Sequence, residues 1–111
     1  MTESEWLVSS EPDLMLEVLV GKIDRATLVE FVRQCWARII RLVQGAPHDL
    51  TVVDQFSAIA DQLNDLDAAT CAAEAVLKAA GWAPDLREEQ THQADLLRRL
   101  VGNPFRADAA R

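Results

Sequence analysis

The chain has 111 residues, of which 50% are hydrophobic, 26% charged and 5% aromatic. This composition is typical of a globular protein, and it excludes a disordered or collagen-like chain. A chain of this length buries enough surface to fold without a metal ion or a disulfide bond. We therefore expect a single domain over residues 1–111.

Acidic residues outnumber basic residues in both halves of the chain. Eighteen Asp and Glu against eleven Lys and Arg give a formal net charge of −7. Residues 1–55 hold nine acids and five bases, and residues 56–111 hold nine acids and six bases. An acidic surface repels nucleic-acid phosphates and anionic lipid headgroups. The charge therefore disfavours both nucleic acid and membrane as partners.

Neither a leader nor a membrane span is predicted. The longest mostly apolar stretch, Leu14 to Val20, has seven residues and contains Glu17, whereas a membrane-spanning helix takes about 20. The opening residues, Met1 to Glu5, do not place a basic segment before an apolar one. We therefore expect a cytoplasmic protein whose two cysteines, Cys35 and Cys71, stay reduced.

Apolar residues recur with helical spacing along the chain, and no segment alternates with the period of a strand. The pattern predicts an all-α fold. Because the connections between helices are short, neighbouring helices are expected to be antiparallel, which gives a small bundle of five to six helices. The predicted helical segments are residues 2–8, 11–20, 24–44, 50–63, 66–80 and 85–101.

Polar residues and glycines mark the predicted helix ends. Thr2 and Glu5 have the spacing of a capping box, and Ser10 and Asp24 are the predicted N-caps of the next two helices. Each glycine follows an apolar run, where a helix commonly ends in a left-handed residue. The four glycines predicted to end helices are Gly21, Gly45, Gly81 and Gly102.

The sequence contains no strong metal-binding or catalytic motif. Zinc sites usually present two ligands within a few residues of each other, whereas Cys35, His48, Cys71 and His92 lie far apart. Burial of Cys35 on an apolar helix face would keep its thiol inert. We therefore expect neither a cofactor nor a metal, and a protein that is not an enzyme. An enzymatic interpretation would need a pocket that gathers Cys71, His92 and Asp95.

Two segments have the wrong polarity for a small isolated core. Leu14 to Val20 is apolar around nearly the whole helix, whereas Glu89 and Gln93 fall on the apolar side of the last helix. Either the fold covers both segments or they stay open to a partner. The second interpretation predicts a non-enzymatic protein-interaction or adaptor module, with a homodimer as one form of that partnership. The predicted partner-binding residues are Leu14, Leu16, Val20, Glu89 and Gln93.

Arginines on the long third helix support an alternative function. Arg33, Arg38 and Arg41 share the polar face of this helix, where they could contact nucleic-acid phosphates. The net charge of −7 and the lack of aromatic residues between these arginines weigh against that function. A nucleic-acid-associated regulator is therefore the alternative to the interaction module.

Both ends of the chain carry recognisable segments. The opening reads MTESEWL, and the closing part reads QADLLR at 93–98 and GNPFR at 102–106. In these segments the chain resembles a family of uncharacterised planctomycete-type bacterial proteins. The resemblance implies a natural helical domain and no particular activity. Its members tend to have adjacent cysteines where this chain has Cys35 and Trp36, so a role for such a pair does not carry over.

Overall fold

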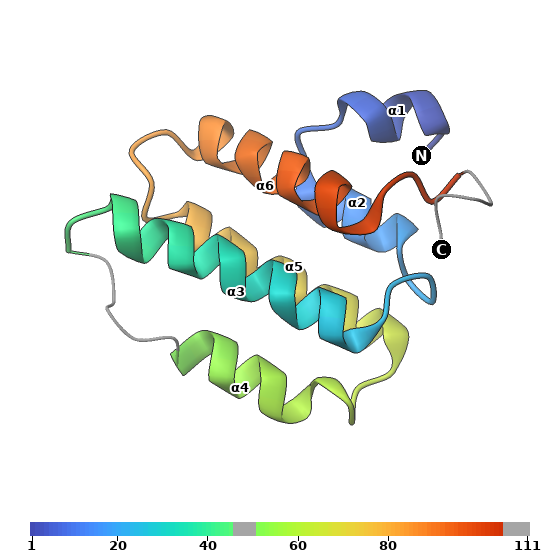
Figure 1. The fold of residues 1–111 in the computed structure, drawn as a ribbon, viewed down its shortest axis with the longest axis horizontal. Helices are drawn as coiled ribbons and strands as arrows, with labels where there is room; N and C mark the ends of the chain where they lie inside the picture. Colours follow the sequence, from blue (N-terminus) through green and yellow to red (C-terminus); the bar gives the residue numbers. More distant parts are fainter. Residues whose placement is uncertain (46–50, 106–111) are drawn as a thin grey trace.

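The computed structural model describes residues 1–45 and 51–105, which fold into helices in the predicted order (Figure 1). This part of the chain contains no strand. None of its helices is both long enough and apolar enough to cross a lipid bilayer. The predicted all-α bundle of five to six helices is confirmed. The helices are α1 (Glu3–Val8), α2 (Pro12–Val18), α3 (Arg25–Leu42), α4 (Thr51–Ala60), α5 (Asp65–Ala80) and α6 (Leu86–Val101).

α3 and α5 lie at the centre of the bundle, and the contact between them is the most extensive one among the described helices. They run side by side in the same direction, and α4 and α6 run against them (Figure 1). Short connections explain these directions, because each connection reverses the chain and two reversals bring α5 parallel to α3. The Cα extents of 42 × 31 × 19 Å fit two layers of helices, since packed helices lie about 8–10 Å apart.

The core draws buried residues from all six helices. The face of α3 that is apolar in the sequence is the buried one, and α5 buries mainly alanines, whose small side chains let neighbouring backbones approach closely. The Trp36 indole N–H donates to the carbonyl of Ala75 over 3.0 Å, which joins α3 to α5. The buried residues of α3 are Leu28, Phe31, Val32, Cys35, Trp36 and Ile39.

Two of the predicted helix starts are confirmed and one is wrong. Thr2 forms the capping box with Glu5, and the Asp24 carboxylate accepts a hydrogen bond from the Thr27 amide over 2.7 Å. Ser10 does not cap α2, because Glu11 occupies the N-cap position without a side-chain cap. The helix instead starts at a proline, which has no amide hydrogen and therefore leaves one fewer donor to be capped. The predicted start of α4 at residue 50 lies outside the described residues.

All four glycines lie at or shortly after a helix end, as predicted, and the expected left-handed conformation is found at three of them. Gly21, Gly45 and Gly102 have positive φ angles of 77°, 92° and 79°. Gly81 is right-handed, with a φ of −62°. The reason is that α5 ends by continuing through further turns, in which the amides of Trp82 and Ala83 donate to carbonyls three residues back. A left-handed residue is not needed where the helix unwinds in this way.

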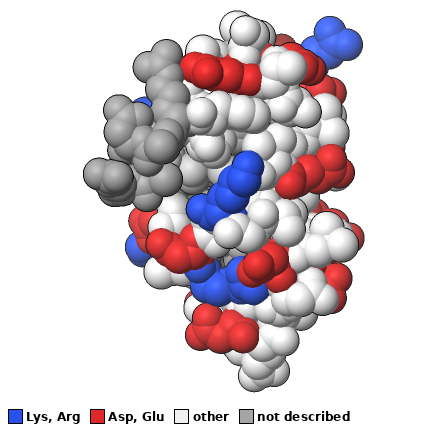
Figure 2. Space-filling view, turned by 90° about the vertical axis from the view of Figure 1, so that its right-hand side faces the viewer, with Lys and Arg blue, Asp and Glu red and all other residues white. Residues whose placement is uncertain are grey.

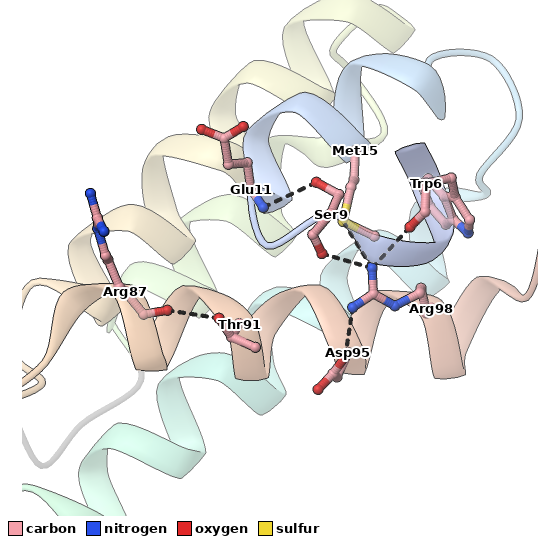
Figure 3. Close-up of polar contacts among 8 residues, drawn as sticks. All are labelled: Trp6, Ser9, Glu11, Met15, Arg87, Thr91, Asp95 and Arg98. Carbon is pink, nitrogen blue, oxygen red and sulfur yellow. Dashed lines mark hydrogen bonds and ion pairs between the residues drawn. The ribbon is translucent and has the colours of Figure 1, made fainter. Parts of the chain in front are cut away.

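Arg98 of α6 attaches the first two helices to the bundle (Figure 3). Its Nη1 donates to the carbonyl of Trp6 over 2.9 Å and to the carbonyl of Ser9 over 2.8 Å. Its Nη2 donates to Asp95 one turn earlier on the same helix. The two carbonyls belong to the end of α1, where intrahelical partners are lacking. Arg98 therefore has a structural role and is not free for a ligand.

Arg25 binds backbone carbonyls at the end of α4, as Arg98 does at the end of α1. Its Nε donates to the carbonyl of Ala60 over 2.9 Å, and its Nη2 donates to that of Leu63 over 2.7 Å. The same guanidinium pairs with Asp65 at the start of α5.

The face of the molecule shown in Figure 2 carries acidic and basic side chains interspersed between uncharged areas.

Candidate interaction groove

The structure leaves exposed only part of the partner-binding surface predicted on α2. Leu14 is 40% exposed, but Leu16 is only 1% exposed and belongs to the core. Val20 is half-buried against that core. The prediction that Leu16 is open to a partner is wrong, because α2 packs against both α5 and α6. Two neighbouring helices therefore cover most of the circumference of this short helix.

The predicted polar edge of α6 is also buried, which is a second correction. Glu89 accepts hydrogen bonds from Nε of Arg38 at 3.2 and 3.0 Å. The Gln93 amide nitrogen donates to the carbonyl of Val76 over 2.8 Å. Partners of this kind make burial of polar groups tolerable. Oε1 of Gln93 is the exception, since it has no hydrogen-bond partner among the described residues.

The three arginines of the alternative function do not form a free cationic face. Arg33 pairs with Glu30 one turn away, and Arg38 pairs with the buried Glu89. Arg41 is exposed and has no ion-pair partner within residues 1–45 and 51–105. Of the three, only Arg41 is therefore available to a phosphate without first giving up a carboxylate.

The residues considered for catalysis do not come together as a trio. Asp95 binds Arg98 (Figure 3), and His92 lies in a pocket beside Cys35 instead of Cys71. Burial raises the pKa of the Cys35 thiol above its usual value, so the group is a neutral thiol and a poor nucleophile. Within the described residues, no three His, Cys, Asp or Glu side chains form a group that could hold a metal ion. His48 lies outside the described residues.

An apolar groove of about 180 Å³ runs beside α2, where that helix meets α5 and α6. We call it the α2–α5 groove. Its floor is mainly apolar, and Leu77, which is 53% exposed, forms one side. The α5 residues in it recur every three or four positions, so they form one stripe along that helix. The lining residues are Pro12, Asp13, Thr70, Ala73, Glu74, Val76, Leu77, Gln90 and Gln93.

The charges of the α2–α5 groove are all negative. Asp13 and Glu74 are its only charged residues, and neither has an ion-pair partner among the described residues. A second, more open depression of about 360 Å³ lies between the start of the chain and α2, and it is lined by Met1, Leu14 and Val18 together with two more acids, Glu5 and Glu17. Exposed apolar surface bordered by carboxylates therefore occurs at two places along α2.

Sequence reasoning placed the interaction surface on α2 and α6 and missed the contribution of α5. The signal was present in α5, where Leu66, Thr70, Ala73 and Leu77 repeat at spacings of three and four residues. This stripe is separate from the buried alanines. An alanine-rich helix needs no leucine outside its core face, so the two exposed leucines indicate a second apolar stripe.

Comparison with protein-family models, with curated protein sequences and with solved structures finds no match to this chain. The resemblance to the planctomycete-type family therefore stays a prediction.

Proposed function

We propose that this protein is an interaction module that binds a cationic amphipathic segment of a partner protein in the α2–α5 groove. The observation that carries this proposal is a mainly apolar groove whose lining includes two exposed carboxylates, Asp13 and Glu74, without an ion-pair partner among the described residues. Apolar side chains of the partner would enter the groove, and its Lys or Arg side chains would meet the rim. The proposed partner is thus a protein segment that presents apolar side chains together with Lys or Arg.

The expected energies require more than one anchor on the partner. Burying one leucine contributes roughly 1.5–3 kcal/mol, and an exposed ion pair at the rim contributes about 0.2–1 kcal/mol. Association itself costs at least about 4 kcal/mol in lost translational and rotational freedom. Two apolar anchors and two cationic groups therefore leave at most about 4 kcal/mol, which corresponds to a dissociation constant of about 1 mM. A segment of this size is the smallest partner expected to bind, with an affinity in the millimolar range.

The charges favour a partner protein over a second copy of the chain. In a two-fold symmetric dimer, the same surface meets itself. A dimer formed through the groove would bring Asp13 and Glu74 of both copies into one interface. Like charges brought together in this way repel each other, whereas a basic segment neutralises them. A homodimer is therefore an outcome that the experiment must be able to detect.

Two helical peptides test the chemistry of the partner. They share one leucine face and differ on the polar face, which carries lysines in one peptide and glutamates in the other. We expect a titration followed by amide chemical shifts to show millimolar binding of the lysine peptide, with the glutamate peptide at least about tenfold weaker. Amide chemical shifts should change at Ala73, Glu74 and Leu77. Equal binding of both peptides would contradict the proposed charge complementarity.

Variants with matched controls locate the binding surface. Leu77→Asp and Glu74→Lys are each expected to weaken the lysine peptide about tenfold, because one removes apolar contact and the other reverses a rim charge. Ile59→Asp, at a position of α4 that is 43% exposed, and Asp61→Lys make the same kinds of change outside the groove, and should alter the affinity by less than about twofold. If the control variants weakened peptide binding as much as the groove variants, this assignment would be refuted. A dimer that sedimentation detects in the unmodified protein and that Leu77→Asp dissociates would refute it as well.

A further inference from the structure

A pocket of about 160 Å³ lies between α3 and α6, and its chemistry is opposite to that of the α2–α5 groove. We call it the α3–α6 pocket. Four nitrogen-bearing basic side chains line it: Arg38 and Arg41 from α3, and His92 and Arg99 from α6. A volume of this size holds several water molecules. The pocket is therefore large enough for a small solvated anion.

Helical spacing explains why these side chains converge. On α3, Gln34, Arg38 and Arg41 follow one another at four and three residues, so they lie on one side of the helix. On α6, Glu89, His92 and Arg99 repeat in the same way, with Leu96 between the last two. Because α3 and α6 pack against each other, these two faces form the walls of one pocket.

The charges in the pocket do not cancel. The Arg38 guanidinium is matched by Glu89, which is buried and hydrogen-bonded to it. Arg41 and Arg99 have no carboxylate partner within the described residues. Two uncompensated positive charges therefore share one pocket in a protein whose formal net charge is −7. Oε1 of the exposed Glu88 lies 3.9 Å from Nε2 of His92.

One acceptor in the pocket wall also lacks a donor. Gln93 lines the pocket and is buried, and its Oε1 has no hydrogen-bond partner among the described residues. An unsatisfied buried acceptor is costly, and it calls for a donor such as a water or a hydroxyl group. Gln93 also lines the α2–α5 groove, so this acceptor lies between the two cavities.

We propose that the α3–α6 pocket binds the phosphate group of a small molecule. Two unpaired guanidinium groups balance a dianion, whereas a single carboxylate would leave one positive charge unmatched. Arginine is also suited to phosphate because its planar N–H groups match two oxygens at once. His92 supplies a further donor from the opposite wall to Arg41. The proposal is independent of peptide binding in the α2–α5 groove, since its charged ligands are different residues.

Phosphate titrations followed by amide chemical shifts test the proposal on the whole chain. Inorganic phosphate is expected to cause saturable shifts at residues 34–41 and 89–99, and chloride at equal ionic strength is not. Sulfate, also a dianion, should compete with phosphate. Glycerol phosphate distinguishes the two sources of the group: it binds at least as tightly as inorganic phosphate if the ligand is an ester, and more weakly if it is free phosphate.

A pair of charge-matched double variants provides the control. Arg41→Gln with Arg99→Gln should weaken phosphate at least about tenfold, whereas Arg33→Gln with Arg87→Gln removes the same charge outside the pocket and should leave it within about twofold. Arg41→Lys with Arg99→Lys should retain partial binding, because the charge stays and the planar geometry is lost. All four positions are exposed, so the variants are expected to fold.

Three results would overturn the phosphate site. The first is an absence of saturable shifts with phosphate in the unmodified protein. The second is an equal loss in the two glutamine double variants, which would mean that only the overall charge matters. The third is binding of a single-stranded oligonucleotide without binding of phosphate or glycerol phosphate, which would favour a nucleic-acid surface over a small-molecule pocket.

Discussion

The surroundings of α5 and the contact between α3 and α6 bury their residues by different chemistry. Around α5 the buried side chains are alanines and Val76, and the cavity beside this helix, the α2–α5 groove, has a mainly apolar surface. Between α3 and α6, the buried Glu89 meets Arg38, and a pocket remains beside them. The comparison indicates that the surface beside α5 suits apolar contacts and that the α3–α6 contact suits charged groups.

The largest expected effect is a loss of stability on enlarging a side chain around α5. Ala72 is fully buried, and Ala72→Leu should lower the free energy of unfolding by about 2–3 kcal/mol, because the extra carbons have no space. Ala73→Leu makes the same change at the half-buried neighbour that lines the α2–α5 groove, and should stay within about 0.5 kcal/mol. Urea unfolding followed by circular dichroism measures both. If the two variants lost similar amounts of unfolding free energy, the buried face of α5 would not be more tightly packed than the face that lines the groove.

A smaller effect is expected at the polar contact between α3 and α6. Glu89→Ala should lower the free energy of unfolding by about 1–2 kcal/mol, since Glu89 is buried while Arg38 is one-third exposed and regains water. Glu30→Ala breaks the exposed pair with Arg33 and should change stability by less than about 0.5 kcal/mol. A double-mutant cycle with Arg38→Ala isolates the pair. A coupling energy near zero would show that this contact contributes nothing beyond packing.

The smallest effect is expected at an exposed helix cap, and it depends on pH. The Thr27 backbone amide donates to Asp24 and lowers the pKa of that carboxyl below its ordinary value of 3.8. A carboxyl whose pKa is lowered in the folded state stabilises the fold above its unfolded pKa, and this contribution is lost as the pH falls through the folded pKa.

Asp24→Asn provides the comparison for that pH dependence, because asparagine keeps an acceptor for the Thr27 amide and does not titrate. The stability advantage of the unmodified protein over Asp24→Asn should be less than about 1 kcal/mol at neutral pH. It should shrink as the pH falls below 3.8. Thermal unfolding at several pH values measures the difference between the two proteins. A difference that stays constant between neutral and acidic pH would contradict the assigned cap.

Local patterns predicted the helices well because they depend on residues close in sequence. The cap formed by Asp24 and Thr27 involves positions three apart, and the buried face of α3 follows from helical periodicity alone. The end of α5 at Gly81 was located correctly, but its right-handed geometry depends on turns that the pattern does not specify.

The candidate sites were harder to predict, because their residues meet across the fold. A helical wheel shows that Glu89 lies on the apolar side of α6, and it does not show that Arg38, 51 residues away, is its partner. In the same way, Gln93 is buried because its amide reaches Val76 on another helix. Both residues were therefore assigned to an open edge. The α2–α5 groove combines side chains of three helices, and no local pattern relates them.

The environment of Trp36 gives the centre of the bundle its own optical signal. Its indole is buried and hydrogen-bonded to Ala75, and Trp6 is buried as well, whereas Trp82 is 44% exposed after the end of α5. Iodide should therefore quench the emission of Trp82 and leave that of Trp36 almost unchanged. With Trp6 and Trp82 replaced by phenylalanine, the remaining fluorophore would report specifically on whether α3 and α5 stay in contact during unfolding or ligand binding.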